Sequence, residues 1–163
     1  MNEKMNIIQY RKEFEDDVIK LIIKIQRNEF NVPISVEDQP DLFNVKEIYQ
    51  TGKGNFWIAT IHQKVVGTIG LLDIGNEQVA LKKMFVHAQY RGRVHQTASK
   101  LLTTAFEWCM SHSVREIYLG TTPQFLAAHR FYEKNGFVQV QREHLPKSFP
   151  ALAVDKKFYK REM

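Results

Sequence analysis

The segment QYRGRVHQTASKLL, residues 89–102, carries the residue types of a phosphate-binding turn. Arg91 and Gly92 follow an apolar run and precede a helical pattern, where backbone N–H groups at a helix N-terminus can bind a pyrophosphate. Arg91 and Arg93 can add charge-assisted hydrogen bonds to phosphate oxygens. Larger residues stand where a second glycine would be expected: Val94, His95 and Gln96.

Hydrophobic periodicity predicts the strands and helices that must position this turn. The predicted strands are residues 7–10, 56–61, 65–74, 79–86, 116–121, 137–141 and 151–159. The predicted helices are residues 12–30, residues 41–49, a helix whose apolar face runs from Ala98 to Cys109, and residues 122–134. For the last helix, Thr122 is the expected N-cap and Pro123 the first-turn proline.

This order of elements predicts one α/β domain, residues 1–163, built on a single mixed sheet. A helix joins strand 79–86 to strand 116–121, so we expect these two strands to be parallel in a βαβ unit. The remaining short connections predict antiparallel pairing at both ends of the sheet. Ligands of such sheets bind at the carboxyl ends of the parallel strands, beside a helix N-terminus. The turn at residues 89–102 lies at that place.

Composition excludes several classes of protein. The 163 residues, of which 44% are hydrophobic and 25% charged, are typical of one soluble globular domain. No apolar run reaches the ~18 residues that span a bilayer, and the first residues show no stretch of signal-peptide length, so we expect a cytoplasmic protein with no membrane partner. Cys109 is the only cysteine, which excludes an internal disulfide and a cysteine-based metal cluster.

The net charge of +5 is modest, and acidic residues are interspersed with the basic ones. Nucleic-acid binding is therefore the least favoured class, whereas an anionic small ligand such as a nucleotide cofactor is compatible with this charge. His87 and His95 flank the turn with no cysteine or carboxylate cluster beside them, so we expect no metal.

Three features together make the chain resemble the GNAT acetyltransferase superfamily: the order of elements, the Arg-Gly turn between a strand and a helix, and the segment AAHRFYEKNGF, residues 127–137. The most specific likeness is the Tyr-x-x-x-Gly-Phe ending at Tyr132, one strand after the Arg-Gly turn. The resemblance covers nearly the whole chain and implies the GNAT fold, acetyl-CoA as co-substrate and an amine acceptor. It also implies a V-shaped gap between residues 81–86 and 117–121, where main-chain groups near three residues would pair with the pantetheine amides: Met84, Phe85 and Val86.

The phosphate motif of this superfamily, Gln/Arg-x-x-Gly-x-Gly/Ala, fits the chain in two registers. Residues 89–94 fit until Val94 stands where a small residue belongs. Residues 93–98 fit except that Gln96 replaces the central glycine. The second register is preferred because a leucine pair then begins three residues after Ala98, as is usual in the family. Including the longer turn before it, the implied cofactor-binding residues are Arg91, Gly92, Arg93, Val94, His95, Gln96, Thr97 and Ala98.

The resemblance also assigns a general acid. Tyr132 occupies the position of the family tyrosine that gives a proton to the departing CoA thiolate. Phe125 stands seven residues earlier, where family members often have asparagine, so a polar contact to the cofactor is either lost or replaced by an apolar one. Ala128, on the same predicted helix, completes the implied cofactor-binding set.

The general base is left open among several carboxylates. Glu29 and Glu37 are slightly preferred to Asp38 and Asp73, although loop carboxylates also serve as caps. We expect residues 30–40 and the loop 145–155 to line the acceptor pocket. The sequence leaves open whether the chain forms a homodimer, and whether it turns over or only holds acyl-CoA as a sensor or partner module.

Overall fold

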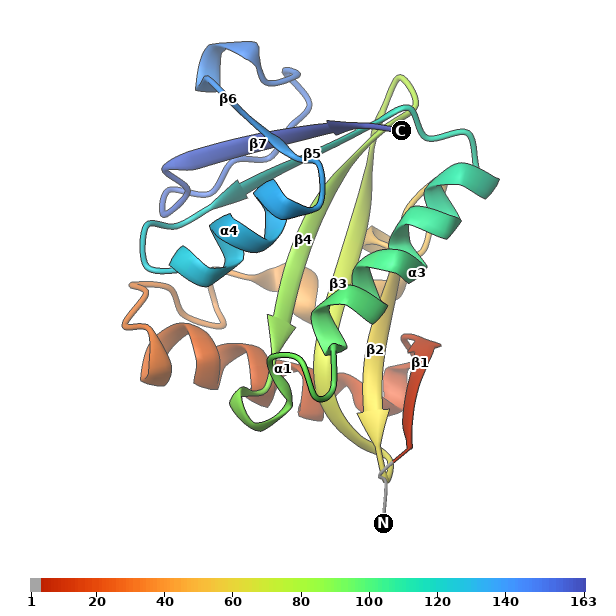
Figure 1. Cartoon of the computed structure of the whole chain (residues 1–163), viewed down its shortest axis with the longest axis vertical. Helices are drawn as coiled ribbons and strands as arrows, with labels where there is room; N and C mark the ends of the chain where they lie inside the picture. The colour runs from red at the N-terminus through yellow and green to blue at the C-terminus, as the bar shows by residue number, and fades with distance from the viewer. Residues whose placement is uncertain (1–3) are drawn as a thin grey trace.

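Seven strands form one sheet in this computed structural model, which describes residues 4–163. The strand order is β1-β2-β3-β4-β5-β7-β6 (Figure 1). The strands are β1 (Met5–Gln9), β2 (Asn55–Ile61), β3 (Lys64–Gly75), β4 (Gln78–Val86), β5 (Glu116–Thr121), β6 (Val138–Val140) and β7 (Lys157–Glu162). β4 and β5 run parallel, and every other neighbouring pair runs antiparallel. The predicted mixed sheet with a central parallel βαβ unit is confirmed.

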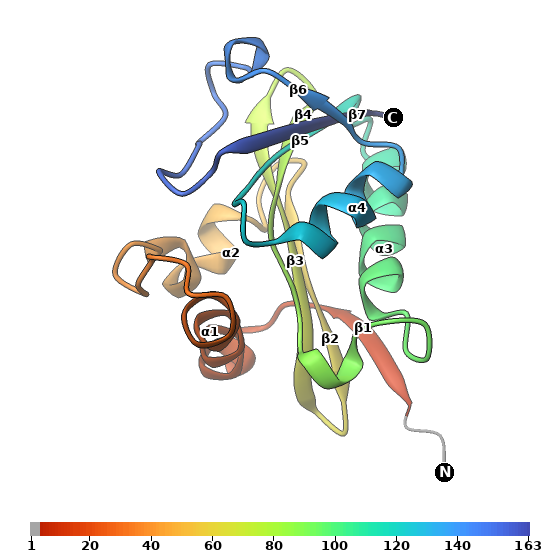
Figure 2. The same cartoon turned by 60° about the vertical axis from the view of Figure 1, so that its left-hand side comes forward.

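Helices cover both faces of the sheet. They are α1 (Glu15–Ile23), α2 (Val45–Ile48), α3 (Thr97–Ser111) and α4 (Leu126–Lys134). α1 and α2 lie on one face, and α3 and α4 on the other (Figure 2). Val18 and Ile22 of α1 belong to one apolar core, while Leu101, Ala105 and Cys109 of α3 belong to a second. None of the helices within residues 4–163 has the length and apolar character that a bilayer crossing needs.

β4 and β5 pair over a short distance and then separate. The parallel ladder joins residues 78–80 of β4 to residues 116–118 of β5. Past this point β5 continues beside β7, whereas β4 continues beside β3 (Figure 1). The main-chain groups of residues 81–86 that point toward β5 therefore have no strand partner in the described part of the chain. A V-shaped gap opens between the two central strands.

A β-bulge distorts β4 beside this gap. The β3–β4 ladder shifts register between Thr68 and Gly70, so Lys83 and Met84 both lie opposite Ile69. Lys83 takes a φ of 57°, and its carbonyl accepts a hydrogen bond from Thr68 Oγ1 at 2.6 Å. Bulges of this kind redirect side chains and occur beside functional sites.

The two helices predicted near the N-terminus are less regular than expected. Residues 12–30 form a 3-10 turn, then α1, then a π-helix at Lys24–Glu29. Residues 41–49 form a 3-10 turn at Pro40–Phe43 followed by α2, because the backbone of Asn44 (φ −139°, ψ 40°) leaves the helical region between them.

The predicted start of the last helix is wrong. Thr122 does not cap α4, which begins at Leu126 with Phe125 as its N-cap residue. The carbonyl of Thr122 instead accepts hydrogen bonds from the backbone N–H of Phe125 at 3.2 Å and from the ring Nε2 of His129 at 2.9 Å. A turn therefore precedes the helix, and Pro123 lies in that turn.

The predicted start of the last strand is wrong as well, since β7 begins at Lys157 and not at residue 151. Asp155 Oδ2 accepts a hydrogen bond from the backbone N–H of Leu152 at 2.9 Å, and the Leu152 carbonyl accepts one from the N–H of Asp155 at 3.0 Å. These two bonds close a turn immediately before the strand.

Candidate active site

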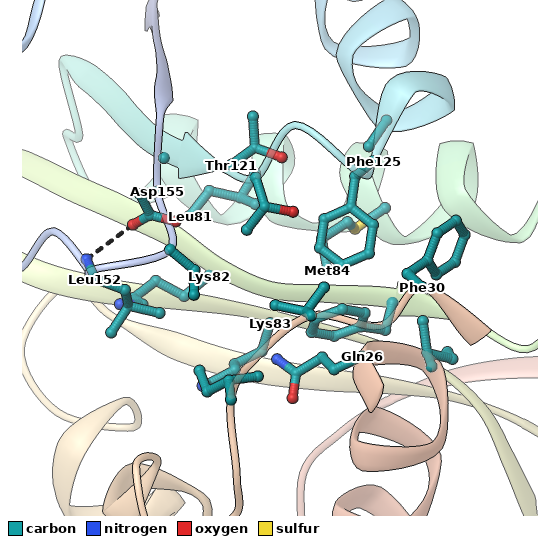
Figure 3. Close-up of a pocket in the computed structure, with 18 of the residues that line it drawn as sticks. Gln26, Phe30, Leu81, Lys82, Lys83, Met84, Thr121, Phe125, Leu152 and Asp155 are labelled. Carbon is teal, nitrogen blue, oxygen red and sulfur yellow. Dashed lines mark hydrogen bonds between the residues drawn. The ribbon is translucent and has the colours of Figure 1, made fainter. Parts of the chain in front are cut away.

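The gap between β4 and β5 opens into a pocket of about 300 Å³. Segments far apart in the sequence line it: the end of the first helical segment, β4, β5, the start of α4 and the loop before β7. Figure 3 shows Phe30 and Phe125 at one end of this pocket and Lys82 and Asp155 at the other, with Met84 between them. The pocket thus has an aromatic end, where the Arg91 guanidinium lies 5.6 Å from the centroid of the Phe30 ring, and an opposite end with Lys82 and Asp155 (Figure 3).

The loop between β4 and α3 presents free backbone donors. α3 begins at Thr97, and no described residue accepts a hydrogen bond from the N–H groups of Thr97, Ala98 or Ser99. Gly92 has a φ of 90° and accepts a hydrogen bond from the N–H of Gln96 at 3.0 Å. Three neighbouring N–H groups at the N-terminus of a 15-residue helix suit an anion such as a pyrophosphate.

Gln96 takes the backbone conformation of a glycine. Its φ of 50° and ψ of 36° lie in the left-handed region, which glycine adopts most readily. Gln96 is the residue that replaces the central glycine in the second motif register, and α3 begins directly after it. The side chain of Gln96 is exposed and caps nothing in the helix.

The side chains of the same loop face different surroundings. Val94 is exposed, whereas the His95 ring packs edge-on against Tyr90 with 5.0 Å between centroids. Thr97 Oγ1 donates a hydrogen bond to the Tyr90 carbonyl at 2.7 Å, which fixes the start of α3 to the strand end. Arg93 is exposed and forms no ion pair with the described residues.

Arg91 and Glu29, predicted as a phosphate ligand and a base, lie against each other. The Arg91 guanidinium donates two hydrogen bonds to the Glu29 carboxylate, one of them at 2.8 Å through Nη2. Arg91 Nε also donates to the Val86 carbonyl at 2.8 Å. The hydrogen bond from Arg91 lowers the pKa of Glu29, which makes this carboxylate a weaker base. The pair joins the loop between β4 and α3 to the end of the π-helix.

The other preferred base, Glu37, is exposed and does not line the pocket. The neighbouring carboxylate of Asp38 accepts hydrogen bonds from the N–H and the hydroxyl of Ser35, each at 3.0 Å. These bonds close a turn and cap no helix, since no side chain among the described residues caps the 3-10 turn that begins at Pro40 or α2 after it.

Tyr132 lies on α4 with its ring in the apolar core, and it lines the pocket. Its hydroxyl forms no hydrogen bond with any described residue. Burial raises the pKa of this phenol, so it stays protonated at neutral pH and can act only as a proton donor there.

Phe125 lines the pocket and packs against two other aromatic side chains. Its ring packs edge-on against Phe30, with 5.0 Å between centroids, and against Phe85, with 6.0 Å. These three aromatic rings close one end of the pocket, and Ala128 lines it one turn further along α4. The three rings come from two loops and from β4, and no local pattern in the sequence indicates that the rings meet.

The sequence does not single out two buried charged groups of the pocket, although one of them, Asp155, lies in the loop 145–155 that is expected there. Asp155 is only 6% exposed, and burial raises the pKa of its carboxyl group. Lys83, at the bulge, donates a hydrogen bond to Gln39 Oε1 at 2.6 Å, and its Nζ lies 3.4 Å from Asp41 Oδ2. Burial lowers the pKa of Lys83. In the sequence, Asp155 is a turn residue before a strand and Lys83 is one of two adjacent lysines, so neither shows a local sign of burial.

The hydroxyl group of Thr122 is a third buried polar group of the pocket, and it has no hydrogen-bond partner among the described residues. Thr122 lies at the end of β5 and lines the pocket. A buried hydroxyl without a partner is costly. A ligand that offers a donor or acceptor in the gap would satisfy it.

Comparison with known proteins agrees with this geometry. A family model described as "Acetyltransferase (GNAT) family" matches residues 19–137. A crystal structure of a GNAT-family acetyltransferase from Staphylococcus aureus Mu50 is 44% identical, covers 98% of this chain and 99% of its own, and superposes with a TM-score of 0.94. The PaiA N-acetyltransferase of Thermoplasma acidophilum, in complex with coenzyme A, shares the fold at 16% identity, with coverages of 98% and 99% and a TM-score of 0.75.

Among curated relatives, the N-acetylaspartate synthetase of Xenopus tropicalis is 36% identical over 104 residues, which is 61% of this chain and 37% of the relative. This chain therefore spans less than half the length of that relative. The family match covers most of the chain, and the similarity to the Staphylococcus aureus structure extends over nearly all of it. The chain belongs to the GNAT acetyltransferase family.

Proposed function

We propose that this protein transfers an acetyl group from acetyl-CoA to a primary amine by direct attack of the amine on the thioester. The observation that carries the proposal is the pocket in the gap between β4 and β5, which is open to free main-chain groups and contains a protonated tyrosine. The family membership supports acetyl transfer, and the curated relatives are named as N-acetyltransferases or N-acetylaspartate synthetases.

The residues of the gap fit acetyl-CoA. A pantetheine arm is an extended chain with two amide groups, and it can pair with residues 81–86 of β4 as an added strand does. The free N–H groups of Thr97, Ala98 and Ser99 suit the pyrophosphate at one end of such a chain. The unpartnered Oγ1 of Thr122 offers a further polar contact inside the gap.

Tyr132 then has a defined role. Attack of an uncharged amine on the thioester carbon forms the C–N bond, and collapse of the tetrahedral intermediate breaks the C–S bond and leaves a thiolate. The Tyr132 phenol supplies a proton to that sulfur and recovers one from the nitrogen of the product. Its raised pKa keeps it protonated until the thiolate forms.

Calorimetric titration with acetyl-CoA and with desulfo-CoA tests cofactor binding, and an acetyl-transfer assay with a panel of amines tests turnover. We expect both nucleotides to bind and CoA to be released only when an amine is present. If neither nucleotide binds at tenfold above its physiological concentration, the proposal is wrong.

One rival function has a specific observation in its favour. Gln96 replaces a glycine in the phosphate loop and Phe125 replaces a polar residue, so the domain can instead hold acyl-CoA as a sensor or partner module without turnover. Tight binding of acetyl-CoA with no transfer to any amine in the panel would favour this rival.

A further inference from the structure

Four charged side chains line the pocket: Lys82, Lys83, Arg91 and Asp155. Two of them are neutralised within the protein, since Arg91 pairs with Glu29, and Lys83 with Asp41. Among the described residues, neither Lys82 nor Asp155 has an ion-pair partner within 4 Å. One cation and one anion of the pocket are thus left for a ligand.

Asp155 is held in place by the chain around it. Its Oδ2 accepts the hydrogen bond from Leu152 N–H and lies against β5 so closely that a Cβ atom on Gly120 would be 2.7 Å away from it. Its Oδ1 accepts no hydrogen bond from a described residue. This oxygen can therefore accept a hydrogen bond from a ligand, or pair with a ligand's cation.

The positive charges near Asp155 do not reverse the effect of burial on its pKa. Lys82 and Lys83 of β4 and Arg142 of the preceding loop all lower the pKa of Asp155, but burial outweighs them and the pKa is raised. Arg142 donates to the Asp155 backbone carbonyl at 3.1 Å, and its guanidinium lies 4.8 Å from the centroid of the Phe158 ring. The carboxylate therefore remains a better proton acceptor than an exposed aspartate.

Lys82 lies at the same end of the pocket as Asp155 (Figure 3). Its ammonium donates a hydrogen bond to the Pro150 carbonyl at 3.4 Å, which leaves two of its three N–H groups for other partners. Burial lowers the pKa of Lys82, while Asp155 and Asp41 oppose that effect. A lone ammonium ligand would face this lysine across a small pocket, and like charges repel.

We infer that the acceptor is a zwitterionic amino acid, whose ammonium group meets Asp155 and whose carboxylate meets Lys82. This inference rests on the proposed acetyl transfer and narrows its substrate class. Each end of such an acceptor neutralises one unpaired charge, whereas an amine without a carboxylate leaves Lys82 unpaired. The two charges lie at the end of the pocket opposite the aromatic rings (Figure 3).

Asp155 is then a catalytic residue. The carboxylate takes one proton from the substrate ammonium, and the neutral amine attacks the thioester carbon. A second proton leaves the nitrogen after the C–N bond has formed, and the CoA sulfur gains one proton through Tyr132. The overall reaction converts one ammonium and one thioester into an amide, a thiol and one proton, which Asp155 releases to solvent.

The test compares three forms of each acceptor: the standard amino acids, their carboxamides and their decarboxylated amines. With wild-type protein we expect kcat/KM for one or more amino acids to be at least tenfold higher than for the corresponding carboxamide and decarboxylated amine. Lys82→Met should raise KM for that amino acid about 10- to 100-fold and leave the decarboxylated amine unaffected or improved. Lys156→Met, a change at an exposed lysine outside the pocket, is the matched control.

Asp155→Asn should lower kcat about 100-fold and remove the acidic limb of the pH profile of kcat/KM, because the group that must be deprotonated is gone. Wild-type protein that acetylates decarboxylated amines as well as amino acids overturns the inference and leaves acetyl transfer standing. An Asp155→Asn variant with an unchanged pH profile overturns the catalytic role. No transfer to any amine would overturn both the inference and the proposed function.

Discussion

Replacing Tyr132 with phenylalanine separates the chemistry of the site from the stability of the fold. The ring of Tyr132 packs against Phe137 with 5.5 Å between centroids and against Tyr159 with 6.2 Å, and phenylalanine keeps both contacts. The hydroxyl has no hydrogen-bond partner among the described residues, so its removal breaks no bond within the protein. We expect the free energy of unfolding to change by less than ~0.5 kcal/mol.

The effect on the rate should be much larger. A positioned general acid contributes about 10²- to 10⁴-fold, and a 100-fold loss of kcat corresponds to about 2.7 kcal/mol of activation free energy. The assay is kcat at saturating acetyl-CoA and acceptor from pH 6 to 9, together with urea unfolding and calorimetric titration of acetyl-CoA. The variant should bind acetyl-CoA and unfold like the wild type, yet turn over at least 100-fold more slowly.

Tyr159→Phe is a control with the opposite expectation. The Tyr159 hydroxyl donates to Glu133 Oε2 at 2.6 Å and lies outside the pocket, so its loss should cost about 1 kcal/mol of stability and leave kcat unchanged. If Tyr132→Phe keeps full kcat across the whole pH range, the phenol is a packing residue and the general-acid role is wrong.

Three further changes test other parts of the reasoning. Glu29→Gln removes a carboxylate whose pKa Arg91 holds below its ordinary value of 4.5. The carboxylate should contribute ~1 kcal/mol or less to the free energy of unfolding at pH 7, and the wild type should lose this contribution as the pH falls through the lowered pKa. Urea unfolding of both proteins at pH 7 and pH 3 measures the difference. Gly120→Ala places a Cβ atom 2.7 Å from Asp155 Oδ2, where ordinary contacts begin at 3.4 Å, so kcat should fall while the calorimetric Kd for acetyl-CoA stays within about twofold. Burial raises the pKa of Cys109 to about 12, so iodoacetamide at pH 8 should label it only on unfolding; rapid labelling of the folded protein would contradict its place in the core.

The sheet could be predicted from the sequence because the residue patterns that mark its strands and turns are local. Alternating apolar residues and glycine-bearing turns mark each strand, and the helix between strands 79–86 and 116–121 determines that they run parallel. The position of the gap between β4 and β5 follows from the same topology. Cys109 could be placed in the core by its spacing from Leu101 and Ala105, with which it shares one face of α3.

The charges of the site could not be predicted, because partners distant in the chain decide them. Glu29 and Arg91 are 62 residues apart, and each has a plausible catalytic role when it is considered alone. Their hydrogen bonds change both roles, since the pair holds the loop in place and weakens the base. Asp155 presents the reverse case, because packing against Gly120 buries an ordinary turn aspartate in the pocket.

The loop between β4 and α3 shows how such distant contacts can stabilise a locally unfavourable backbone conformation. A non-glycine residue in the left-handed region costs roughly 1 kcal/mol, and Gln96 bears this cost at the start of α3. The hydrogen bond from Gln96 N–H to Gly92, the bond from Thr97 Oγ1 to Tyr90, and the attachment of Arg91 to the π-helix hold the loop from three directions. With the backbone held in this way, the N–H groups of the first turn point outward whether or not the central residue is glycine. Glutamine is therefore compatible with anion binding here, because its side chain leaves the first turn of α3 and the backbone supplies the contacts.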